Sequence, residues 1–184
     1  QPDVEWSAWY LADSQGLFKA KGVDVEFLHG GPNTPAVAQV LVPRAGGASF
    51  PEVAANNPDT SFTVVDTVID APNVASLVFA EEQGSFLVGA AAALKSQTGT
   101  IGFIGGVETD LIKKFEAGYT AGAQAVNPDI EVLVNYITQP PDFTGFNDPA
   151  KGKEIAASQY EAGADIIYAA AGGSGLGVFE AAAA

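Results

Sequence analysis

Residues 100–138 read TIGFIGGVETDLIKKFEAGYTAGAQAVNPDIEVLVNYIT, and the fold class follows from their pattern. The apolar run Thr100–Ile104 ends in a pair of glycines, which is typical of a buried strand. The next segment, Asp110–Val126, has helical spacing, and Asn127-Pro128 stops it. Glu131–Ile137 is again rich in apolar and β-branched residues, which predicts a second strand.

The same strand–loop–helix pattern continues toward residue 184. A Pro-rich loop over 138–146 leads to Asp148, an expected N-cap, and then to a helix over 149–162 that begins with proline. A strand over 165–170, a glycine loop and the start of a helix over 176–184 follow. Such units in series predict parallel strands joined by right-handed crossovers.

The preceding residues alternate in the same way. We expect an amphipathic helix over 8–21, strands over 62–65 and 74–79, and a helix over 81–96 whose small residues suit close packing on a sheet. Shorter elements are expected at 3–6, 23–28, 34–41 and 51–57. The sequence therefore predicts an α/β protein with parallel sheets and flanking helices.

The charge balance excludes several classes of partner. With 22 acidic and 8 basic residues and a net charge of -14, the chain lacks the clustered lysines and arginines that bind nucleic acid or anionic lipid head groups. A solvated acidic surface is the simpler interpretation. There is no Cys and His29 is the single His, so thiol chemistry and multi-His metal sites are excluded, and no cofactor is predicted.

No apolar run approaches the length of a membrane span. The chain begins at Gln1 and contains no Met, so a processed or trimmed product is expected. Membrane attachment is expected only through a lipid anchor, which would require a Cys before Gln1.

Candidate binding residues follow the predicted strands, because ligands of parallel α/β sheets bind beyond the carboxyl ends of the strands. These positions are Asp66 and Thr67, 105–109, 138–148 and 171–175. Among them, Asp66 ends an apolar strand, and its carboxylate can accept hydrogen bonds from ligand hydroxyl or ring N–H groups. A turn-capping role for Asp66 is the alternative.

The loop AAGGSG, residues 170–175, follows one predicted strand and opens a helix. Bare N–H groups of Gly172, Gly173 and Ser174 can hold an anionic or hydroxyl-rich ligand there, although a tight turn explains the glycines equally well. The dinucleotide motif G-x-G-x-x-G is not satisfied, and no Walker A lysine motif is present.

Two aromatic residues and one carboxylate complete the candidate site. Phe146 and Tyr168 lie near the mouth of the same predicted sheet and can stack on a flat base, although Tyr168 lies within a strand, where core packing is the alternative. Asp148 can touch the ligand, although its capping role already explains it. No pair of carboxylates has a plausible acid–base partner, so we expect binding without enzyme activity.

Four stretches within residues 51–184 resemble the basic membrane protein (PnrA-like) family, which includes purine-nucleoside receptors of ABC importers. They are NPDTSFTVVD, NVASLVFAEEQGSFLVGAAAAL, GTIGFIGGVETDLIKKFEAGYTAGAQAVNPDIEVLVNY and FNDPAKGKEIAASQYEAGADIIYAAAGGSGLGVFEAA. The resemblance implies the type I periplasmic-binding fold, in which two α/β lobes hold the ligand. It also implies a partial first lobe over 51–98 and a truncated second lobe over 99–184.

The resemblance implies roles for individual residues as well. Asp66 matches a polar contact of the first lobe, and Tyr168 stands where the family often has the Phe that stacks on the base. Gly172 and Gly173 match the loop that faces the ligand. The first-lobe motif D-x-S-F-N is absent, and the later G-V-D-S-D-Q type segment, with its ribose-binding Asp, has no counterpart up to Ala184.

Residues 1–50 resemble a different family. The stretch WSAWYLADSQGLFKAKGVDVEFLHGGPNTPAVAQVL is similar to the opening of the NMT1/THI5-like binding proteins, which serve uptake of thiamine precursors. A hybrid chain with a join near residues 46–50 is therefore expected.

Three functions remain open at this point. The favoured one is a solute receptor of an ABC importer, on the periplasmic or extracellular face of a bacterial or archaeal plasma membrane. Its partners would be a nucleoside-like small molecule and a transporter permease. The second is an enzyme on a Rossmann-like sheet, which the failed dinucleotide motif disfavours. The third is a folded fragment or chimera with no ligand function.

Overall fold

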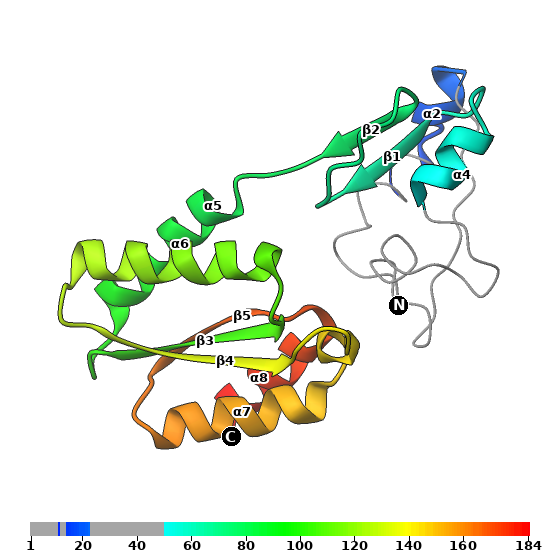
Figure 1. Ribbon diagram of the computed structural model, residues 1–184. Coiled ribbons are helices and arrows are strands. Elements are labelled where there is room, and N and C mark those ends of the chain that lie inside the picture. The colour runs from blue at the N-terminus through cyan, green and yellow to red at the C-terminus, as the bar shows by residue number, and fades with distance from the viewer. Residues whose placement is uncertain (1–10, 12–13, 23–49) are drawn as a thin grey trace. The chain divides into compact units, whose positions relative to one another are not determined.

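The structure is a computed structural model that describes residue 11, residues 14–22 and residues 50–184 (Figure 1). The chain divides into two compact units, residues 1–35 and 36–184. In the first unit, α2 spans Leu17–Ala20 within the predicted helix over 8–21, and Gly22 follows it with φ 72°. The elements expected at 3–6, 23–28 and 34–41, and also His29, lie outside the described residues.

The second unit contains a three-stranded parallel sheet with the strand order β4-β3-β5. Its strands are β3 (Thr100–Val107), β4 (Glu131–Thr138) and β5 (Ile166–Ala170). Phe103 of β3 lies opposite Val134 of β4 and opposite Tyr168 of β5. The predicted parallel arrangement is therefore confirmed.

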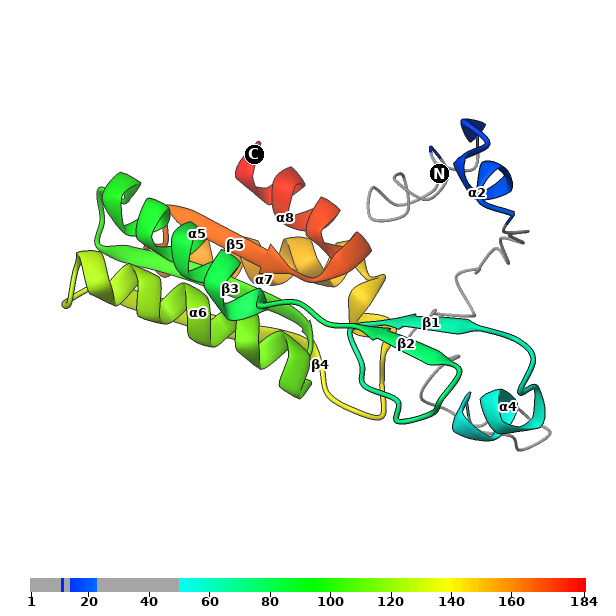
Figure 2. The ribbon, with the colours of Figure 1, turned by 90° about the horizontal axis from the view of Figure 1, so that it is seen from above.

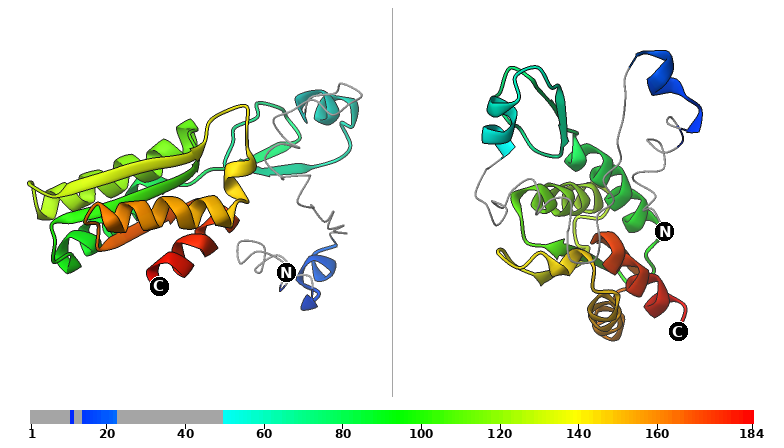
Figure 3. Two further views of the ribbon diagram at one scale, coloured as in Figure 1. Left: turned by 90° about the horizontal axis from the view of Figure 1, so that it is seen from below. Right: turned by 90° about the vertical axis from the view of Figure 1, so that its right-hand side faces the viewer.

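Helices cover both faces of this sheet (Figures 1 and 2). Helices α5 (Glu81–Lys95) and α6 (Asp110–Val126) pack against each other on one face. Helices α7 (Pro149–Glu161) and α8 (Gly175–Ala182) pack on the other, which faces the viewer in the left view of Figure 3. The fold is thus the expected α/β class with flanking helices.

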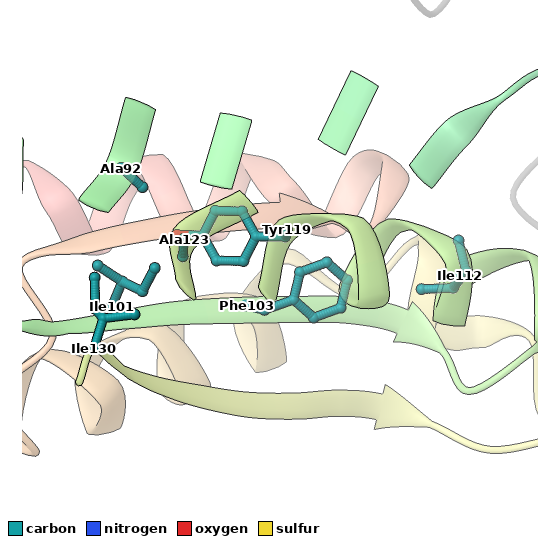
Figure 4. Packing of buried hydrophobic residues seen from close by; sticks show 7 residues of the cluster. All are labelled: Ala92, Ile101, Phe103, Ile112, Tyr119, Ala123 and Ile130. Atoms are coloured by element: carbon teal, nitrogen blue, oxygen red, sulfur yellow. The ribbon is translucent and has the colours of Figure 1, made fainter. Parts of the chain in front are cut away.

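Strand β3 is the centre of the core because it is buried on both faces. Ile101 and Phe103 are fully buried beneath α5 and α6, where they contact Tyr119 and Ala123 (Figure 4). The next side chain along, Ile104, is also fully buried but belongs to the cluster under α7 and α8. Alternate residues of one strand therefore serve two hydrophobic layers, as in other doubly covered parallel sheets.

The small residues of α5 pack in two directions. Ala92 joins the core over β3, in line with the predicted packing on the sheet, whereas a Cβ at Gly89 would overlap the backbone carbonyl of Tyr119 in α6. In the same way, a Cβ at Gly122 of α6 would overlap the backbone carbonyl of Phe86 in α5. The two helix backbones therefore touch directly, which requires glycine at these positions.

A second, two-stranded parallel sheet is formed by β1 (Phe62–Val65) and β2 (Val74–Leu77). Helix α4 spans Phe50–Asn56, close to the element predicted at 51–57.

The predicted boundaries between segments, at residues 50/51 and 98/99, remain predictions. Helix α5 lies before residue 99, yet it packs on α6 and contributes Ala92 to the core over β3.

Strand β3 is longer than predicted, since it continues past Ile104 to Val107. Gly105 pairs with Tyr136 on one side and Ala170 on the other, so the glycine pair continues the strand rather than ending it. A Cβ at Gly105 would lie 2.5 Å from the ring of Tyr136, which explains why the strand has no side chain there.

Among the described helices, none has the length and apolar character needed to cross a bilayer.

Candidate functional site

The carboxyl ends of β3, β4 and β5 meet at one edge of the sheet, which we call the rim. The rim consists of the residues that follow these strands: 108–109, 139–148 and 171–174. The chain passes from β3 to β4 on one side and returns to β5 on the other. Helices α6 and α8, which follow β3 and β5, lie on opposite faces of the sheet. The loop from β3 to α6 and the loop from β5 to α8 therefore run to opposite faces of the sheet. Open α/β sheets bind ligands at such a switch point.

The two predicted glycines lie at the rim, in the short 3-10 helix η3 (Gly172–Ser174). Gly172 has φ 54°, a left-handed conformation that glycine adopts without steric cost. A Cβ on Gly172 would lie 3.0 Å from the carbonyl oxygen of Phe146. A Cβ on Gly173 would lie 3.0 Å from Oδ1 of Asn147. The loop after β5 thus packs closely on the loop after β4.

Phe146 also lies at the rim, at the end of the 3-10 helix η2 (Thr144–Phe146). Its half-buried ring packs over the end of β3, where a Cβ on Gly106 would overlap it. Phe146 therefore comes together with Gly172 and Gly173, as the sequence predicts. It is the aromatic side chain that the structure places beside the predicted glycine loop.

Asp148 caps α7, which confirms the capping interpretation. Its Oδ1 accepts a hydrogen bond from the backbone N–H of Lys151 at 2.9 Å. Its own backbone N–H donates to Oγ of Ser174 at 2.7 Å. These bonds give Asp148 a structural role, and the predicted ligand contact is not needed to explain it.

Ser174 is fully buried, with 0% of its surface exposed. Its hydroxyl donates to the carbonyl of Gly145 at 2.7 Å and accepts from the Asp148 N–H. The predicted contact between the Ser174 N–H and a ligand is disfavoured, because this N–H donates to the carbonyl of Ala171 at 3.1 Å. The side chain is also hydrogen-bonded on both sides inside the protein.

Tyr168 points into the core rather than toward the rim. Its ring centroid lies 5.2 Å from that of Tyr119 and 5.8 Å from that of Phe103, and its hydroxyl lies 3.4 Å from Oγ of Ser85. The core-packing alternative is thus the one that the geometry favours. The stacking role that the resemblance implied stays a prediction, because the half-buried ring of Tyr168 packs on these two aromatic neighbours.

Tyr168 does line a pocket, but this pocket does not contain the other candidates. It has a volume of about 280 Å³ and is lined by residues of α5, α6 and β5. Its lining is almost entirely apolar and consists of Val88, Ala91, Ala92, Lys95, Tyr119, Ile166, Ile167 and Tyr168. Neither Asp66 nor Gly173 belongs to it. This pocket therefore does not bring Tyr168 together with Asp66 or Gly173.

Asp66 lies at the end of β1, as predicted, and has φ 62°. Its backbone N–H donates to the carbonyl of Leu77 at 2.9 Å. Desolvation raises the pKa of the Asp66 carboxyl above its ordinary value, and the nearby Glu81 raises it further, whereas Lys114 lowers it. Glu81 is itself buried and paired with Lys114 at 3.4 Å. Asp66 therefore interacts electrostatically with Glu81 of α5 and Lys114 of α6.

The sequence did not reveal that Glu108, Gln139 and Lys113 form a polar cluster at the ends of β3 and β4. Nε2 of Gln139 donates to Oε2 of Glu108 at 2.6 Å, and Nζ of Lys113 lies 3.0 Å from Oε1 of Glu108. Hydrogen bonding and charge from Lys113 hold the pKa of Glu108 below its usual range. Glu108 belongs to the stretch 105–109 that strand positions had marked, but only the tertiary structure brings Gln139 to it.

The described residues contain no group of three or more His, Cys, Asp or Glu side chains that could hold a metal ion. The rim offers the ring of Phe146, bare glycine backbone, the amides of Gln139 and Asn147, and the carboxylate of Glu108, which is paired with Lys113. This chemistry suits a small organic molecule with a flat ring and hydroxyl groups.

Solved structures of ABC transporter solute-binding proteins share this fold. A crystal structure of ABC transporter system solute-binding proteins from Aeropyrum pernix K1 superposes with a TM-score of 0.69 and 25% identity, covering 92% of this chain and 52% of that one. The chain therefore has the α/β fold of the periplasmic-binding proteins.

Sequence comparison assigns the family. The model of the ABC transporter substrate-binding protein PnrA-like family (Bmp) matches residues 47–184, and the chain belongs to this family. The ABC transporter nucleoside-binding protein BmpA of Lactococcus lactis subsp. cremoris is 48% identical over 132 residues, which are 71% of this chain and 36% of that protein. The chain thus spans about a third of that relative's length.

The proposed hybrid origin of residues 1–50 is not borne out. Basic membrane protein B of Borrelia garinii subsp. bavariensis is 42% identical over 178 residues, which cover 94% of this chain and 46% of that protein. An alignment of this length extends well before residue 47, where the family match begins. Similarity to the basic membrane proteins therefore continues into the region that was assigned to the NMT1/THI5-like family.

Proposed function

We propose that this chain forms part of an extracytoplasmic receptor that binds a purine nucleoside for an ABC importer, without chemical conversion. The observation that carries the proposal is the meeting of Phe146, Gly172 and Gly173 at the switch point between β3 and β5. A flat base needs an aromatic or apolar surface, and a ribose needs hydrogen-bonding groups that approach closely. Glycine backbone provides such an approach because no side chain stands in the way.

Phe146 replaces Tyr168 as the proposed aromatic contact. Phe146 lies at the rim beside the glycines, whereas Tyr168 is enclosed by Tyr119 and Phe103. The side chain of Asn147 is exposed next to Gly173 and adds an amide that can donate and accept hydrogen bonds. In this proposal Asp66 contributes from the other sheet, as the family resemblance implies.

The charge of the protein supports a neutral ligand. A net charge of -14 creates a negative potential that repels phosphate groups. The receptor therefore selects a nucleoside over the corresponding nucleotide. The name of the Lactococcus relative, which is 48% identical, also describes nucleoside binding. The permease of the importer is the proposed protein partner.

A ligand panel tests the proposal. Inosine, guanosine and adenosine are titrated by calorimetry and by thermal shift, with adenosine monophosphate, ribose and free adenine as comparison ligands. We expect a nucleoside to raise the melting temperature and to bind more tightly than its nucleotide, because a ligand that binds only the folded state stabilises it. A flat response to all three nucleosides at millimolar concentration would refute the proposal.

A further inference from the structure

Ser174 joins three segments that are far apart in the sequence. Its hydroxyl donates to the carbonyl of Gly145 in η2 and accepts from the N–H of Asp148 at the start of α7, both at 2.7 Å. Ser174 itself lies in η3, directly after the two glycines of the rim. One fully buried hydroxyl therefore connects the loop after β4, the loop after β5 and the first turn of α7.

Both partners of this hydroxyl flank the residues proposed to face the ligand. Gly145 precedes Phe146, and Asp148 follows Asn147. The two hydrogen bonds thus hold the segment 145–148 at each end. Between these bonds, the Phe146 carbonyl and the Asn147 side chain lie against Gly172 and Gly173.

The surroundings leave this connection little freedom to move. A Cβ on Gly145 would overlap the carbonyl of Gly106 and lie 2.5 Å from Oγ1 of Thr138, so the backbone of η2 is pressed onto β3 and β4. On the other side, a Cβ on Gly152 of α7 would overlap the carbonyl of Ser174. Loss of the hydroxyl would leave the partly buried N–H of Asp148 and the buried carbonyl of Gly145 without these bonds.

We propose that Ser174 is a positioning residue of the ligand site: its hydroxyl holds Phe146 and Asn147 in place against the glycine loop without touching the ligand. This inference rests on the proposed nucleoside-binding function. It replaces the direct ligand contact that the sequence had suggested for Ser174 with an indirect role.

The test compares two buried serines of the same unit. Ser174→Ala removes the hydroxyl at the rim, and Ser85→Ala removes a buried hydroxyl of α5 that lies 3.4 Å from the Tyr168 hydroxyl. Hydrogen exchange of the Asp148 amide in the ligand-free protein reports the position of the loop, and calorimetry with inosine reports binding. In Ser174→Ala we expect at least about tenfold faster exchange at Asp148 and about tenfold weaker binding, and in Ser85→Ala we expect neither change.

A second pair of variants separates the hydroxyl from general effects on folding. Ser174→Thr and Ser174→Val have nearly the same shape, and only Thr keeps the hydroxyl. We expect Thr to retain slower exchange and tighter binding than Val. If both variants without the hydroxyl fail to fold while Thr folds, Ser174 supports the whole domain rather than the rim, and the proposal is wrong.

Three further results would each decide the role of Ser174 in a different way. Unchanged exchange at Asp148 in Ser174→Ala would overturn the positioning role whatever the ligand is. Faster exchange with unchanged inosine affinity would show that the loop moves without consequence for binding, which also overturns it. If the wild-type protein binds no nucleoside, the proposed function fails first, and the exchange data then assign Ser174 to loop order alone.

Discussion

Gly89 of α5 lies directly against the backbone carbonyl of Tyr119 in α6, with no room for even a methyl group between them. The same relationship recurs between Gly122 of α6 and the carbonyl of Phe86 in α5. Tyr119 is fully buried and contacts Phe103 and Tyr168, with ring centroids 6.2 and 5.2 Å apart. The close approach of the two helices therefore sets the position of a central aromatic side chain of the core.

Gly89→Ala should destabilise the protein strongly. The added methyl group must push α5 away from α6, and overpacking of this kind costs about 1–3 kcal/mol. Urea unfolding followed by circular dichroism measures the change in the free energy of unfolding. Gly84→Ala is the matched control in the same helix, because nothing lies within 4 Å of its Cβ position. There we expect a gain of about 0.5–1 kcal/mol from helix propensity, and a loss equal to that of Gly89→Ala would contradict the packing argument.

Phe146→Ala should weaken nucleoside binding by about tenfold or more, because it removes the aromatic surface proposed to contact the base. Tyr168→Phe keeps the enclosed ring and removes only the hydroxyl that lies 3.4 Å from Ser85. We expect this second variant to bind as the wild type does. Calorimetric titration of both variants with inosine checks the assignment. Unchanged affinity in Phe146→Ala would remove Phe146 from the proposed contact with the base.

The sequence predicted elements whose signals are local. Helix α6 spans Asp110–Val126 as predicted, because Thr109 caps its start and Asn127-Pro128 lies at its end. Strand β1 also agrees residue for residue with its predicted range, 62–65. These elements depend on neighbouring residues along the chain, which a sequence displays directly.

The direction of individual side chains depended on distant residues and was predicted less well. Tyr168 was assigned to the correct strand, but only the packing of Tyr119 and Phe103 shows that its ring faces the core. Ser174 was assigned to the correct loop, but its hydroxyl is directed inward by Gly145 and Asp148. Sequence position thus located the rim, while tertiary contacts decided which of its residues remain available to a ligand.

Asp66→Asn should stabilise the protein at neutral pH. The pKa of this carboxyl is raised in the folded state, chiefly by desolvation and then by Glu81, so the folded protein binds the proton more tightly than the unfolded chain. Stability therefore falls as the pH rises from the ordinary value of 3.8 through the raised one. Asparagine removes this loss and also tolerates the φ of 62° at this position.

Asp142→Asn is the control with the opposite sign. Hydrogen bonds from the side chain and backbone of Thr144 lower the pKa of Asp142, so its contribution is present above the ordinary pKa and is lost as the pH falls. Urea unfolding of both variants from pH 3 to pH 7 measures the difference. We expect the two variants to depart from the wild type in opposite directions at pH 7 and to converge with it in acid. Parallel curves would refute the sign assigned to Asp66.

Gly172→Ala should lower both stability and nucleoside affinity, whereas Gly99→Ala should lower stability alone. Both glycines have a positive φ, 54° and 78°, and alanine in such a conformation costs about 1–2 kcal/mol. Only the Cβ at Gly172 meets a neighbour, 3.0 Å away at the carbonyl of Phe146, while nothing lies within 4 Å of the position at Gly99. The methyl group on Gly172 therefore displaces the segment that carries Phe146 and covers backbone proposed to approach the ligand. Urea unfolding and inosine titration separate the two effects, and equal affinities for the two variants would remove the glycine loop from the binding site.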